Sequence, residues 1–406
     1  MSKDLEFLDE LLEKHGQPSA LIDNFHSDNG FAIWGYKNIF RSDLENTFLN
    51  NIKINGNQIN LLQSQFDKWL ASNQMIGTIG FVSYEIKNLF YPHIKFKISN
   101  TKHPCLWFAQ PDSIRKYKFE SIKSYKKKSF LKLEKDIFQL PIYEKLIFKI
   151  KEELKKGNSY QINLTMPKLF SFKNISPLEI YLTIREFVHP PYGYFIDTGK
   201  EQIMSFSPEQ FFQTENNIIK SFPMKGTRPR MHDISDDVKM KNELSNSEKD
   251  KAEHLMIVDL LRNDIGKICN YGSVKVKDLF KINSYTTVHQ MVSCVYGELK
   301  KNIKYVDILK ALCPGGSITG APKESSMKII DSLESYNREI YTGGIGHIDQ
   351  QKNIHFNIAI RTMIAQDNII NYSVGGGIVW DSVASKELDE AHLKSKILDK
   401  FITNQQ

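Results

Sequence analysis

Four short apolar segments separated by brief turns constrain the fold more than any other feature of the chain. They are YGYFIDT, EQIMSFS, EQFFQTE and NIIKSFP, within residues 192–223, with turns at Thr198-Gly199 and Asn216-Asn217. Such short connections join antiparallel strands, because a parallel pair needs a crossover of a dozen or more residues. The four segments therefore predict one antiparallel meander. The rest of the chain does not alternate strictly between strand and helix, which disfavours a doubly wound parallel sheet. We therefore expect an α+β fold with large antiparallel β-sheets packed together and covered by helices.

Helices are predicted where apolar residues recur at helical spacing or where a helix-start signature occurs. One face of residues 143–154 is apolar, and Gly157 is placed to end that helix. SPLE (176–179) has serine as N-cap, proline in the first turn and glutamate three residues after the serine. A long helix is expected over roughly 236–264, and a further one opens at the Ala-Pro pair 321–322.

Three further segments predict strands. GTIGFVSYE (77–85) has the glycine spacing of a buried strand with a bend, and SYQINLT (159–165) reads as a second strand. HFNIAIRTM (355–363) alternates, with Phe356, Ile358 and Ile360 on one side and polar residues on the other. We expect its polar side to line a polar cavity.

The composition indicates a soluble globular protein, with 41% hydrophobic and 25% charged residues. The first residues carry acids where a signal peptide needs basic residues, and no apolar run reaches the ~18 residues of a membrane-spanning helix. We expect a cytoplasmic protein with no membrane contact. The cysteines are far apart in the sequence, which argues against a zinc ribbon or redox dithiol; they are Cys105, Cys269, Cys294 and Cys313.

The net charge of +7 is concentrated in one segment. Residues 115–136 hold nine Lys or Arg against three acids, interspersed with Tyr and Phe. Such a run could bind nucleic acid, which salt-sensitive retention on DNA would reveal. The remainder is nearly neutral and has no nucleic-acid motif, so a solvated linker is preferred and no nucleic-acid partner is expected. We divide the chain into an N-terminal α/β region (1–114), a basic linker (115–140) and a catalytic domain (141–402).

Four segments combine glycines and charges within apolar surroundings. They are SFSPEQF (205–211), PMKGTRPR (223–230), PGGSITGAPK (314–323) and SVGGGIV (373–379). Ser317 and Thr319, just before a helix N-terminus, would form an anion site. The backbone N–H groups of Gly375, Gly376 and Gly377 would let a carboxylate approach closely. Each segment alone is weak evidence, because a glycine-rich turn is more often only structural.

Acidic residues on two expected helices suggest a metal site. Glu253 lies on the long helix, whereas Glu387, Glu390 and Lys394 share a face of the last helix. Carboxylates brought together from two helices are the hard-oxygen ligands that Mg²⁺ takes. On spacing alone, two solvated helix faces with ion pairs inside each helix are favoured over a metal site.

Read together, nine segments resemble the chorismate-binding enzymes in content and order. They span roughly residues 142–400 and are YQINLT, SFSPEQF, PMKGTRPR, EHLMIVDLLRND, PGGSITGAPK, YTGGIGH, IAIRTM, GGGIVWDS and DEAHLK. Nine ordered motifs exclude a chance match, whereas any one alone would be only a hypothesis. The resemblance implies the anthranilate synthase component I-like fold, with IGFVSYE and WFAQPDS in its more variable portion.

The resemblance also implies roles for single residues. Glu253 and Glu390 would hold Mg²⁺ at the ring carboxylate of chorismate, which Lys394 and the Gly375–Gly377 amides would also bind. Tyr341 and Arg361 would hold the enolpyruvyl carboxylate, Arg361 through its two-pronged guanidinium. The other implied roles are a general acid at the C4 hydroxyl and a histidine near the ring, taken by Glu209 and His289. His347 stands where the family often has tyrosine.

Two positions discriminate within the family. Lys225 stands where anthranilate synthases carry a small residue, and its amine would attack C2 while Glu209 protonates the C4 hydroxyl. That role needs a lysine with a lowered pKa. Gln161 stands where water-adding isochorismate and salicylate synthases carry a lysine base. The resemblance therefore implies a transferase of aminotransferase type, making 4-amino-4-deoxychorismate for 4-aminobenzoate and folate biosynthesis.

The source of ammonia is also implied. The sequence has no Cys–His–Glu glutaminase segment, so a separate glutamine amidotransferase subunit is the expected partner, with chorismate as the small-molecule substrate. The main alternative is the large subunit of an anthranilate synthase, and a water-adding enzyme is more distant. Whether the N-terminal region binds tryptophan stays open.

Overall fold

The computed structural model describes residues 6–25, 27, 29–97, 103–119, 130–136, 139–285 and 288–402. The helices in these residues are α1 (Leu8–His15), α2 (Gln58–Trp69), α3 (Lys87–Phe90), α4 (Leu140–Lys155), α5 (Pro177–Val188), α6 (Ile234–Asn246), α7 (Glu248–Gly266), α8 (Tyr305–Leu312), α9 (Lys323–Leu333) and α10 (Ala384–Ser395). Short 3₁₀ helices are η1 (Tyr84–Ile86), η2 (Gly316–Ile318) and η3 (Lys396–Phe401).

The strands form two large sheets. They are β1 (Ala20–Asn24), β2 (Asn29–Ser42), β3 (Thr47–Leu49), β4 (Ile52–Ile54), β5 (Ile76–Val82), β6 (Leu106–Lys118), β7 (Leu131–Asp136), β8 (Gln161–Phe172), β9 (Tyr192–Asp197), β10 (Gln202–Ser207), β11 (Gln210–Glu215), β12 (Ile218–Ser221), β13 (Met224–Pro229), β14 (Lys275–Ser284), β15 (Val288–Glu298), β16 (Gly320–Ala321), β17 (Gly344–Asp349), β18 (Ile354–Ile358), β19 (Thr362–Gln366) and β20 (Ile369–Ile378).

All pairs between these strands are antiparallel, which confirms the predicted fold class. One sheet runs β8-β20-β19-β10-β9-β1. The other runs β6-β5-β17-β18-β11-β12-β15, with β13 and β14 also paired to β15. The long strand β2 pairs with both β1 and β6 and so joins the two sheets at one side.

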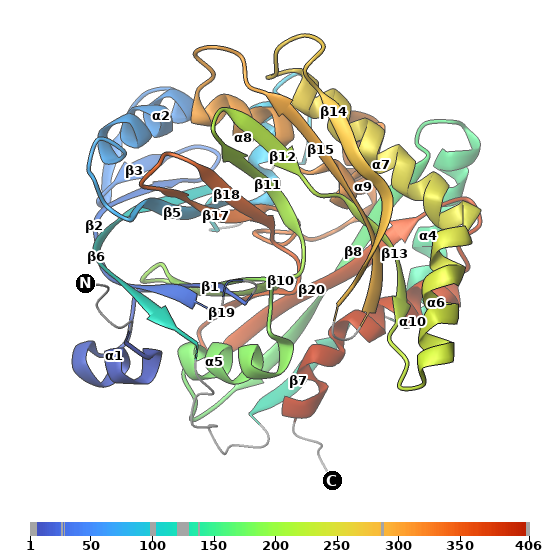
Figure 1. Cartoon of the computed structure of the whole chain (residues 1–406), viewed down its shortest axis with the longest axis horizontal. Helices are drawn as coiled ribbons and strands as arrows, with labels where there is room; N and C mark the ends of the chain where they lie inside the picture. Colours follow the sequence, from blue (N-terminus) through green and yellow to red (C-terminus); the bar gives the residue numbers. More distant parts are fainter. Residues whose placement is uncertain are drawn as a thin grey trace.

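Three apolar clusters show how the layers pack. Neighbouring residues of one strand go to different clusters, because successive side chains point to opposite faces. Ile22 and Phe81 lie in the cluster between the sheets, whereas Leu21 and Val82 lie in the two outer clusters beneath helices. Helices α2, α7 and α8 contribute to one outer cluster, and α4, α5 and α10 to the other (Figure 1). The result is a two-sheet sandwich covered by helices on both sides.

The predicted four-strand meander is wrong, because it is two hairpins in different sheets. β9 pairs with β10 and β11 with β12, but β10 continues to β19 and β11 to β18. The chain crosses between the sheets after Ser207, whose hydroxyl donates to the Ile358 carbonyl at 2.7 Å. This long-range bond fixes a crossing that the local sequence pattern does not reveal.

The predicted single strand 355–363 is likewise wrong, since it divides into β18 and β19. Arg361, between them, has a φ of +50°, which turns the chain out of the extended conformation. This second crossing lies beside the first. The Ile358 amide donates to the Glu209 carbonyl at 3.1 Å, and the Phe206 amide donates to the Arg361 carbonyl at 3.0 Å. Glu209 and Arg361 therefore lie in the same region, where the chain crosses twice from one sheet to the other.

The long helix predicted over 236–264 is two helices, α6 and α7, that meet at Ser247. The Ser247 hydroxyl accepts the Asp250 amide at 3.2 Å and caps α7, while the Ser247 backbone is extended. A serine cap of this kind competes with continuation of the preceding helix. The break sets the direction of α7, which carries Glu253.

Other helix predictions are confirmed. Helix α4 buries Tyr143, Ile147 and Ile150 and is followed by Gly157 at φ +73°; α9 begins at Lys323. The predicted strand 77–85 is β5, ending at Val82.

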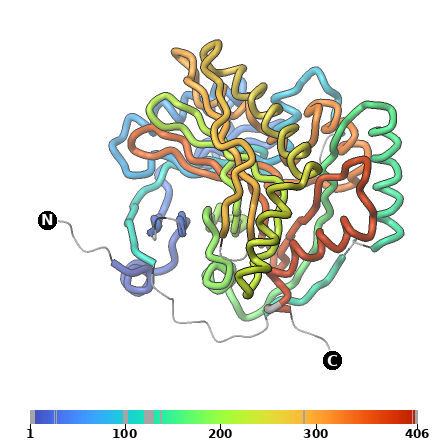
Figure 2. The backbone as a smooth tube through the Cα atoms, turned by 45° about the vertical axis from the view of Figure 1, so that its right-hand side comes forward, coloured from blue at the N-terminus to red at the C-terminus, as the bar shows by residue number. Residues whose placement is uncertain are grey.

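The N-terminal region shares its sheets with the rest of the chain, since β1 pairs with β9 and β5 with β17. In Figure 2 the N-terminal strands, in blue and cyan, lie beside later strands drawn in green and orange-red. The described parts of the expected linker 115–140 include the end of β6, all of β7 and the start of α4; its residues 120–129 and 137–138 lie outside the described ranges. No helix in the described residues is long and apolar enough to cross a membrane.

The cap of α5 gives a test of the fold. The Ser176 hydroxyl accepts the Glu179 amide at 3.2 Å, and the Glu179 carboxylate accepts the Ser176 amide at 2.7 Å. We expect Ser176→Ala to lower the free energy of unfolding by about 1 kcal/mol in urea titrations. Ser245→Ala, at an exposed position in the last turn of α6, is the control and should leave stability unchanged or slightly higher. Equal unfolding midpoints for the two variants would contradict a stabilising cap.

Candidate active site

Lys225 is positioned by an irregularity in β13. The pairing with β15 shifts register between Lys225 and Thr227, and Gly226 between them has a φ of +71°. A Cβ at Gly226 would lie 2.8 Å from Leu244 Cδ1 and 3.1 Å from Asp250 Cβ. Glycine is therefore required for backbone conformation and for space, and the bulge re-aims the neighbouring lysine.

Glu209 and Lys225 have pKa values shifted toward each other. Burial raises the pKa of Glu209 to about 7, although the Lys225 charge and the Ser317 hydroxyl oppose this. Burial lowers the pKa of Lys225; Lys394 acts in the same direction, whereas Glu253 and Glu209 oppose it. A carboxyl that can hold a proton near neutrality and an amine that can lose one are suited to acid and nucleophile roles.

Helix α7 presents Glu253 and His254 beside Lys225. Burial raises the pKa of Glu253, while the charges of Lys225 and Lys249 lower it; Lys249 Nζ lies 3.9 Å from Glu253 Oε1. His254 is fully buried, and its Nε2 lies 2.7 Å from the Ser293 hydroxyl. Burial and the nearby Lys225 charge lower the pKa of His254 to about 4, so this imidazole is neutral at pH 7.

Helix α10 supplies the facing charges. Lys394 Nζ lies 2.7 Å from Glu390 Oε1 and donates to the Gly375 carbonyl at 3.0 Å. Burial raises the pKa of Glu390, but the ion pair with Lys394 and the charges of Lys225 and Lys249 together outweigh burial, so the pKa is lowered. The charges of Lys225 and Lys249 act on Glu390 as well as on Glu253, which places both carboxylates around the same cations.

The donor set fits a magnesium ion that keeps part of its water shell. Among the described residues, no three His, Cys, Asp or Glu side chains are grouped closely enough to hold a metal by themselves. Mg²⁺ commonly binds through one or two carboxylates, with water and substrate oxygens completing its shell. Glu253 and Glu390 could supply these two carboxylates; Glu387, the third acid of the predicted two-helix cluster, also acts electrostatically on Glu253.

The glycine run of β20 lies against β8. Gly375 pairs with Thr165 and Gly377 with Asn163, while the other edge of β20 pairs with β19 only as far as Tyr372. Within the described residues, that edge of the glycine run has no strand partner. Gln161 is fully buried, and neither polar atom of its side-chain amide has a hydrogen-bond partner. A Cβ at Gly377 would lie 2.5 Å from Gln161 Nε2, so this amide lies against the glycine run.

Tyr341 and Arg361 lie around Tyr372. Arg361 is exposed and Tyr341 is 7% exposed. Burial raises the pKa of both tyrosines; the Tyr372 charge raises that of Tyr341, and Arg361 lowers that of Tyr372. No described side chain pairs with the Arg361 guanidinium, so the fork is available for a carboxylate.

The remaining predicted site residues are Ser317, Thr319 and His289, and each has a polar partner within the protein. The Ser317 hydroxyl donates to Glu209 Oε1 at 3.4 Å, whereas the Thr319 hydroxyl donates to the Gly315 carbonyl at 2.8 Å. His289 lies between the Asp237 carboxylate at 3.0 Å and the Ser284 hydroxyl at 2.8 Å. A ligand would have to compete with these bonds to engage Thr319 or His289. Their roles toward substrate stay predictions.

His347 occupies the position where the resemblance led us to expect a tyrosine. Its Nδ1 lies 2.9 Å from the Tyr194 hydroxyl, and its ring stacks on His355. Burial lowers the pKa of His347 to about 3, with a further contribution from His355. The residue is a neutral histidine engaged with neighbouring strands.

Comparison with known sequences identifies the family. Residues 17–400 match the family described as chorismate binding enzyme. This chain belongs to the chorismate-binding enzyme family. The resemblance drawn from the nine segments is confirmed.

Relatives within the family carry two different names. Anthranilate synthase component 1 of Saccharolobus solfataricus is 34% identical over 368 residues, covering 86% of this chain and 87% of that protein. Aminodeoxychorismate synthase component 1 of Bacillus subtilis is 39% identical over 260 residues, covering 64% of this chain and 55% of that protein. Several matches thus span only about half of the relative.

A solved structure supports the same fold. Anthranilate synthase component I from Streptococcus pneumoniae TIGR4 superposes with a TM-score of 0.79 at 25% identity, covering 91% of each chain. The menaquinone-specific isochorismate synthase of Escherichia coli, at 14% identity and a TM-score of 0.74, shares the fold over 95% of this chain. The predicted anthranilate synthase component I-like fold is confirmed.

Gly376 offers a test of how this family member uses its glycine run. A Cβ there would lie 3.7 Å from Lys394 Nζ and 3.8 Å from Glu387 Oε2, which are ordinary contacts, and φ is not positive. The fold therefore does not require glycine at this position. We expect Gly376→Ala to keep the thermal unfolding midpoint but to reduce chorismate turnover at least tenfold, because the methyl group would occupy the approach to the amides.

The matched control is Gly266→Ala on α7, where a Cβ would meet nothing within 4 Å. It should leave both stability and turnover near the wild-type values. Full activity in Gly376→Ala would contradict carboxylate binding by this run.

Proposed function

We propose that this chain is the chorismate-aminating large subunit of an aminodeoxychorismate synthase. The observation that carries the proposal is Lys225, held on a bulge beside Glu209 with a lowered pKa, while the Glu209 pKa is raised to about 7. Direct addition of ammonia at C2, as in anthranilate synthesis, needs no lysine nucleophile. A covalent relay for amination at C4 does.

The proposed first step couples two bonds. The neutral Lys225 amine attacks C2, both ring double bonds shift toward C4, and the C4–O bond breaks as protonated Glu209 gives its proton to the departing hydroxyl, which leaves as water. Ammonia then adds at C4, both double bonds shift back, and the C2–N bond to Lys225 breaks with its electron pair returning to the amine. A proton lost from the incoming nitrogen restores the starting charge, and the product is 4-amino-4-deoxychorismate.

The other residues would bind and orient chorismate. Arg361 and Tyr341 would hold the enolpyruvyl carboxylate, with the guanidinium taking both oxygens. Lys394 and the Gly376 amide would face the ring carboxylate. When bound at Glu253 and Glu390, Mg²⁺ would neutralise that carboxylate and the two acidic side chains together.

The nitrogen donor would be ammonia supplied from glutamine by a partner amidotransferase subunit. The name component 1, carried by relatives of both activities, supports a two-component enzyme. The pathway would then be that of 4-aminobenzoate and folate.

Anthranilate synthase component I is the second candidate. The Saccharolobus protein of that name matches over 87% of its own length, whereas the Escherichia coli aminodeoxychorismate synthase component 1 matches over 53% at 40% identity. Identity therefore does not separate the two activities. Chromatography of the product made from chorismate, Mg²⁺ and an ammonium salt decides between them.

Replacement of Lys225 tests the covalent relay. We expect Lys225→Ala to lose most amination at C4, because ammonia must then displace the hydroxyl without an intermediate. Some product aminated at C2 is expected in its place. In the wild type without ammonia, mass spectrometry should detect an adduct on Lys225 with the mass of chorismate less one water.

Lys220→Ala on the neighbouring strand β12 is the control, since Lys220 forms an ion pair with Glu215 at 2.8 Å away from these groups. It should keep normal turnover and an adduct on Lys225. Retention of full C4 amination by Lys225→Ala, with no adduct in the wild type, would reject the lysine relay.

The same pair predicts a pH dependence. The reactive form holds one proton, on Glu209, with Lys225 neutral, and such a pair titrates as a unit. Since burial raises the pKa of Glu209 to about 7, kcat/KM should fall as pH drops below about 7, where the pair takes up a second proton. Rates are compared at equal concentrations of free ammonia.

In Lys225→Ala the pH dependence of turnover should be the opposite of that in the wild type. Residual turnover needs only protonated Glu209, so it should fall as pH rises through the Glu209 pKa, which loss of the Lys225 charge raises further. Identical profiles for the wild type and the variant would show that this pair does not set the acid limb.

A further inference from the structure

We propose that Arg338, paired with Glu334, is a positioning residue that holds together three backbone segments around the chorismate site. This inference rests on the proposed function, because it assigns the segments to one substrate site. Arg338 itself would not touch substrate. Neither residue was singled out by the sequence motifs.

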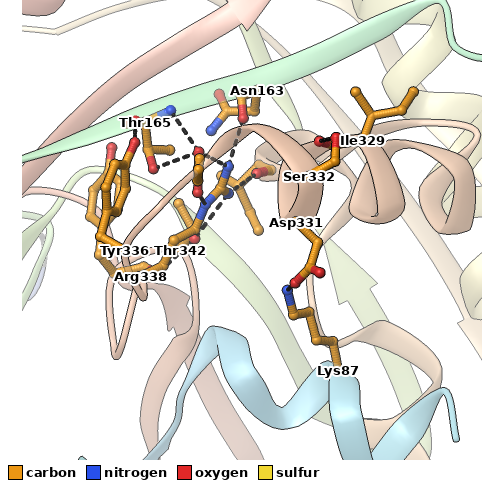
Figure 3. Close-up of polar contacts among 12 residues, drawn as sticks. Lys87, Asn163, Thr165, Ile329, Asp331, Ser332, Tyr336, Arg338 and Thr342 are labelled. Carbon is orange, nitrogen blue, oxygen red and sulfur yellow. Dashed lines mark hydrogen bonds and ion pairs between the residues drawn. The ribbon is translucent and has the colours of Figure 1, made fainter. Parts of the chain in front are cut away.

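The Arg338 guanidinium is bonded in several directions (Figure 3). Nε and Nη2 donate to the two Glu334 oxygens, each at 2.8 Å, and both side chains are nearly fully buried, with 1% and 4% exposed. The remaining bonds go to three separate segments: Nη2 to the Asn163 carbonyl at 2.7 Å, Nη1 to the Ile318 carbonyl at 3.0 Å and Nη1 to the Thr342 hydroxyl at 3.3 Å.

Glu334 extends the network along β8. Its Oε1 accepts the Thr165 amide at 3.0 Å and the Thr165 hydroxyl at 2.9 Å, while the Tyr336 hydroxyl donates to the Thr165 carbonyl. Thr165 pairs with Gly375, and Asn163 with Gly377. The ion pair therefore anchors the strand directly behind the glycine run.

The other two anchored segments also lead to proposed substrate groups. Ile318 lies between Ser317, which contacts Glu209, and Thr319. Thr342 follows Tyr341, whose amide donates to the Arg338 carbonyl at 3.0 Å. One guanidinium thus fixes the spacing between the glycine run, the Ser317 segment and Tyr341.

Only arginine can make this set of bonds. Its planar group carries five donors in fixed directions, whereas a lysine ammonium is a point charge on a flexible stem. Two further contacts hold Arg338 in place. Its backbone amide donates to Glu85 Oε1 at 3.0 Å, and its guanidinium lies 4.5 Å from the centroid of the Tyr84 ring. Lysine at 338 would keep the charge opposite Glu334 but release one or more of the three segments.

The chain contains a matched control in Arg185. Arg185 Nη1 donates to both Asp23 oxygens at 2.9 and 3.0 Å, and their side chains are 1% and 0% exposed. Asp23 also accepts the Tyr117 and Tyr181 hydroxyls. This pair joins α5 to β1 and contacts none of the three segments, so Arg185→Lys disturbs an equally buried pair outside the site.

The experiment compares Arg338→Lys with Arg185→Lys in the full chain, with ammonium as nitrogen donor. Both variants should have lower thermal unfolding midpoints. Only Arg338→Lys should raise the KM for chorismate. The expected rise is about tenfold, because displaced segments would weaken substrate binding by as much as one lost charge-assisted hydrogen bond. Its kcat should change less than its KM. An unchanged KM in Arg338→Lys, or an equal rise in Arg185→Lys, would overturn the positioning role.

Hydrogen exchange provides a readout that does not need turnover. In Arg338→Lys, amide exchange should accelerate together in peptides covering 163–165, 317–319 and 341–342, and in Arg185→Lys it should not. Absence of this joint loosening would overturn the proposal. If exchange accelerates in all three segments but the wild-type protein does not consume chorismate, the proposed function is rejected, while the structural role of Arg338 in joining the segments is retained.

Thr165→Val serves as a milder second variant that keeps the ion pair. It removes the 2.9 Å hydroxyl bond to Glu334 and should raise the KM a few-fold, with faster exchange confined to 163–165. A wild-type KM and exchange pattern in Thr165→Val would overturn the claimed link between Glu334 and the strand behind the glycine run.

Discussion

The double crossing between the sheets is the constraint on which the site depends. Two backbone hydrogen bonds join the crossings, from the Ile358 amide to the Glu209 carbonyl and from the Phe206 amide to the Arg361 carbonyl. Each crossing leaves regular pairing for a few residues, so Glu209 and Arg361 are not confined to the alternating faces of a strand. Because both crossings belong to one hydrogen-bonded unit, the sandwich holds in a fixed relation the two groups proposed to donate a proton and to bind a carboxylate, Glu209 and Arg361.

Burial shifts the pKa values of acids and bases in the site in opposite directions. It disfavours the charged forms of Glu209 and Lys225, so the pKa of Glu209 rises and that of Lys225 falls. Their mutual attraction acts against both shifts. For Glu390, the 2.7 Å ion pair with Lys394 and the charges of Lys225 and Lys249 outweigh burial, so its pKa is lowered. The same environment therefore shifts the pKa values of Glu209 and Glu390 in opposite directions and lowers that of Lys225.

Local chemistry made some elements predictable, while long-range pairing hid others. The cap at Ser176 depends on residues within one turn, and its prediction is confirmed. The neighbours of β10 and β11 depend on β18 and β19, about 150 residues away, so a run of strands with short turns resembled a single meander. The break before Arg361 was hidden because apolar alternation continues through it. For α7 the signal was present, since Ser247 precedes Asp250 by three residues, but helical periodicity on both sides obscured it.

The glycine run shows how much of the site a motif can predict. Family resemblance selected Gly375–Gly377 as one carboxylate-binding unit, yet the three glycines have different neighbours. A Cβ at Gly375 would lie 2.2 Å from the Leu164 carbonyl oxygen, and one at Gly377 would meet Gln161. Both are required by packing between β20 and β8. Gly376 has no such contact, and its open side faces Lys394 and Glu387. A sequence cannot separate these cases, because the difference lies in the partner strand and in α10. Packing explains the glycines at 375 and 377 but not the one at 376, which is why Gly376 is the position where carboxylate binding is tested.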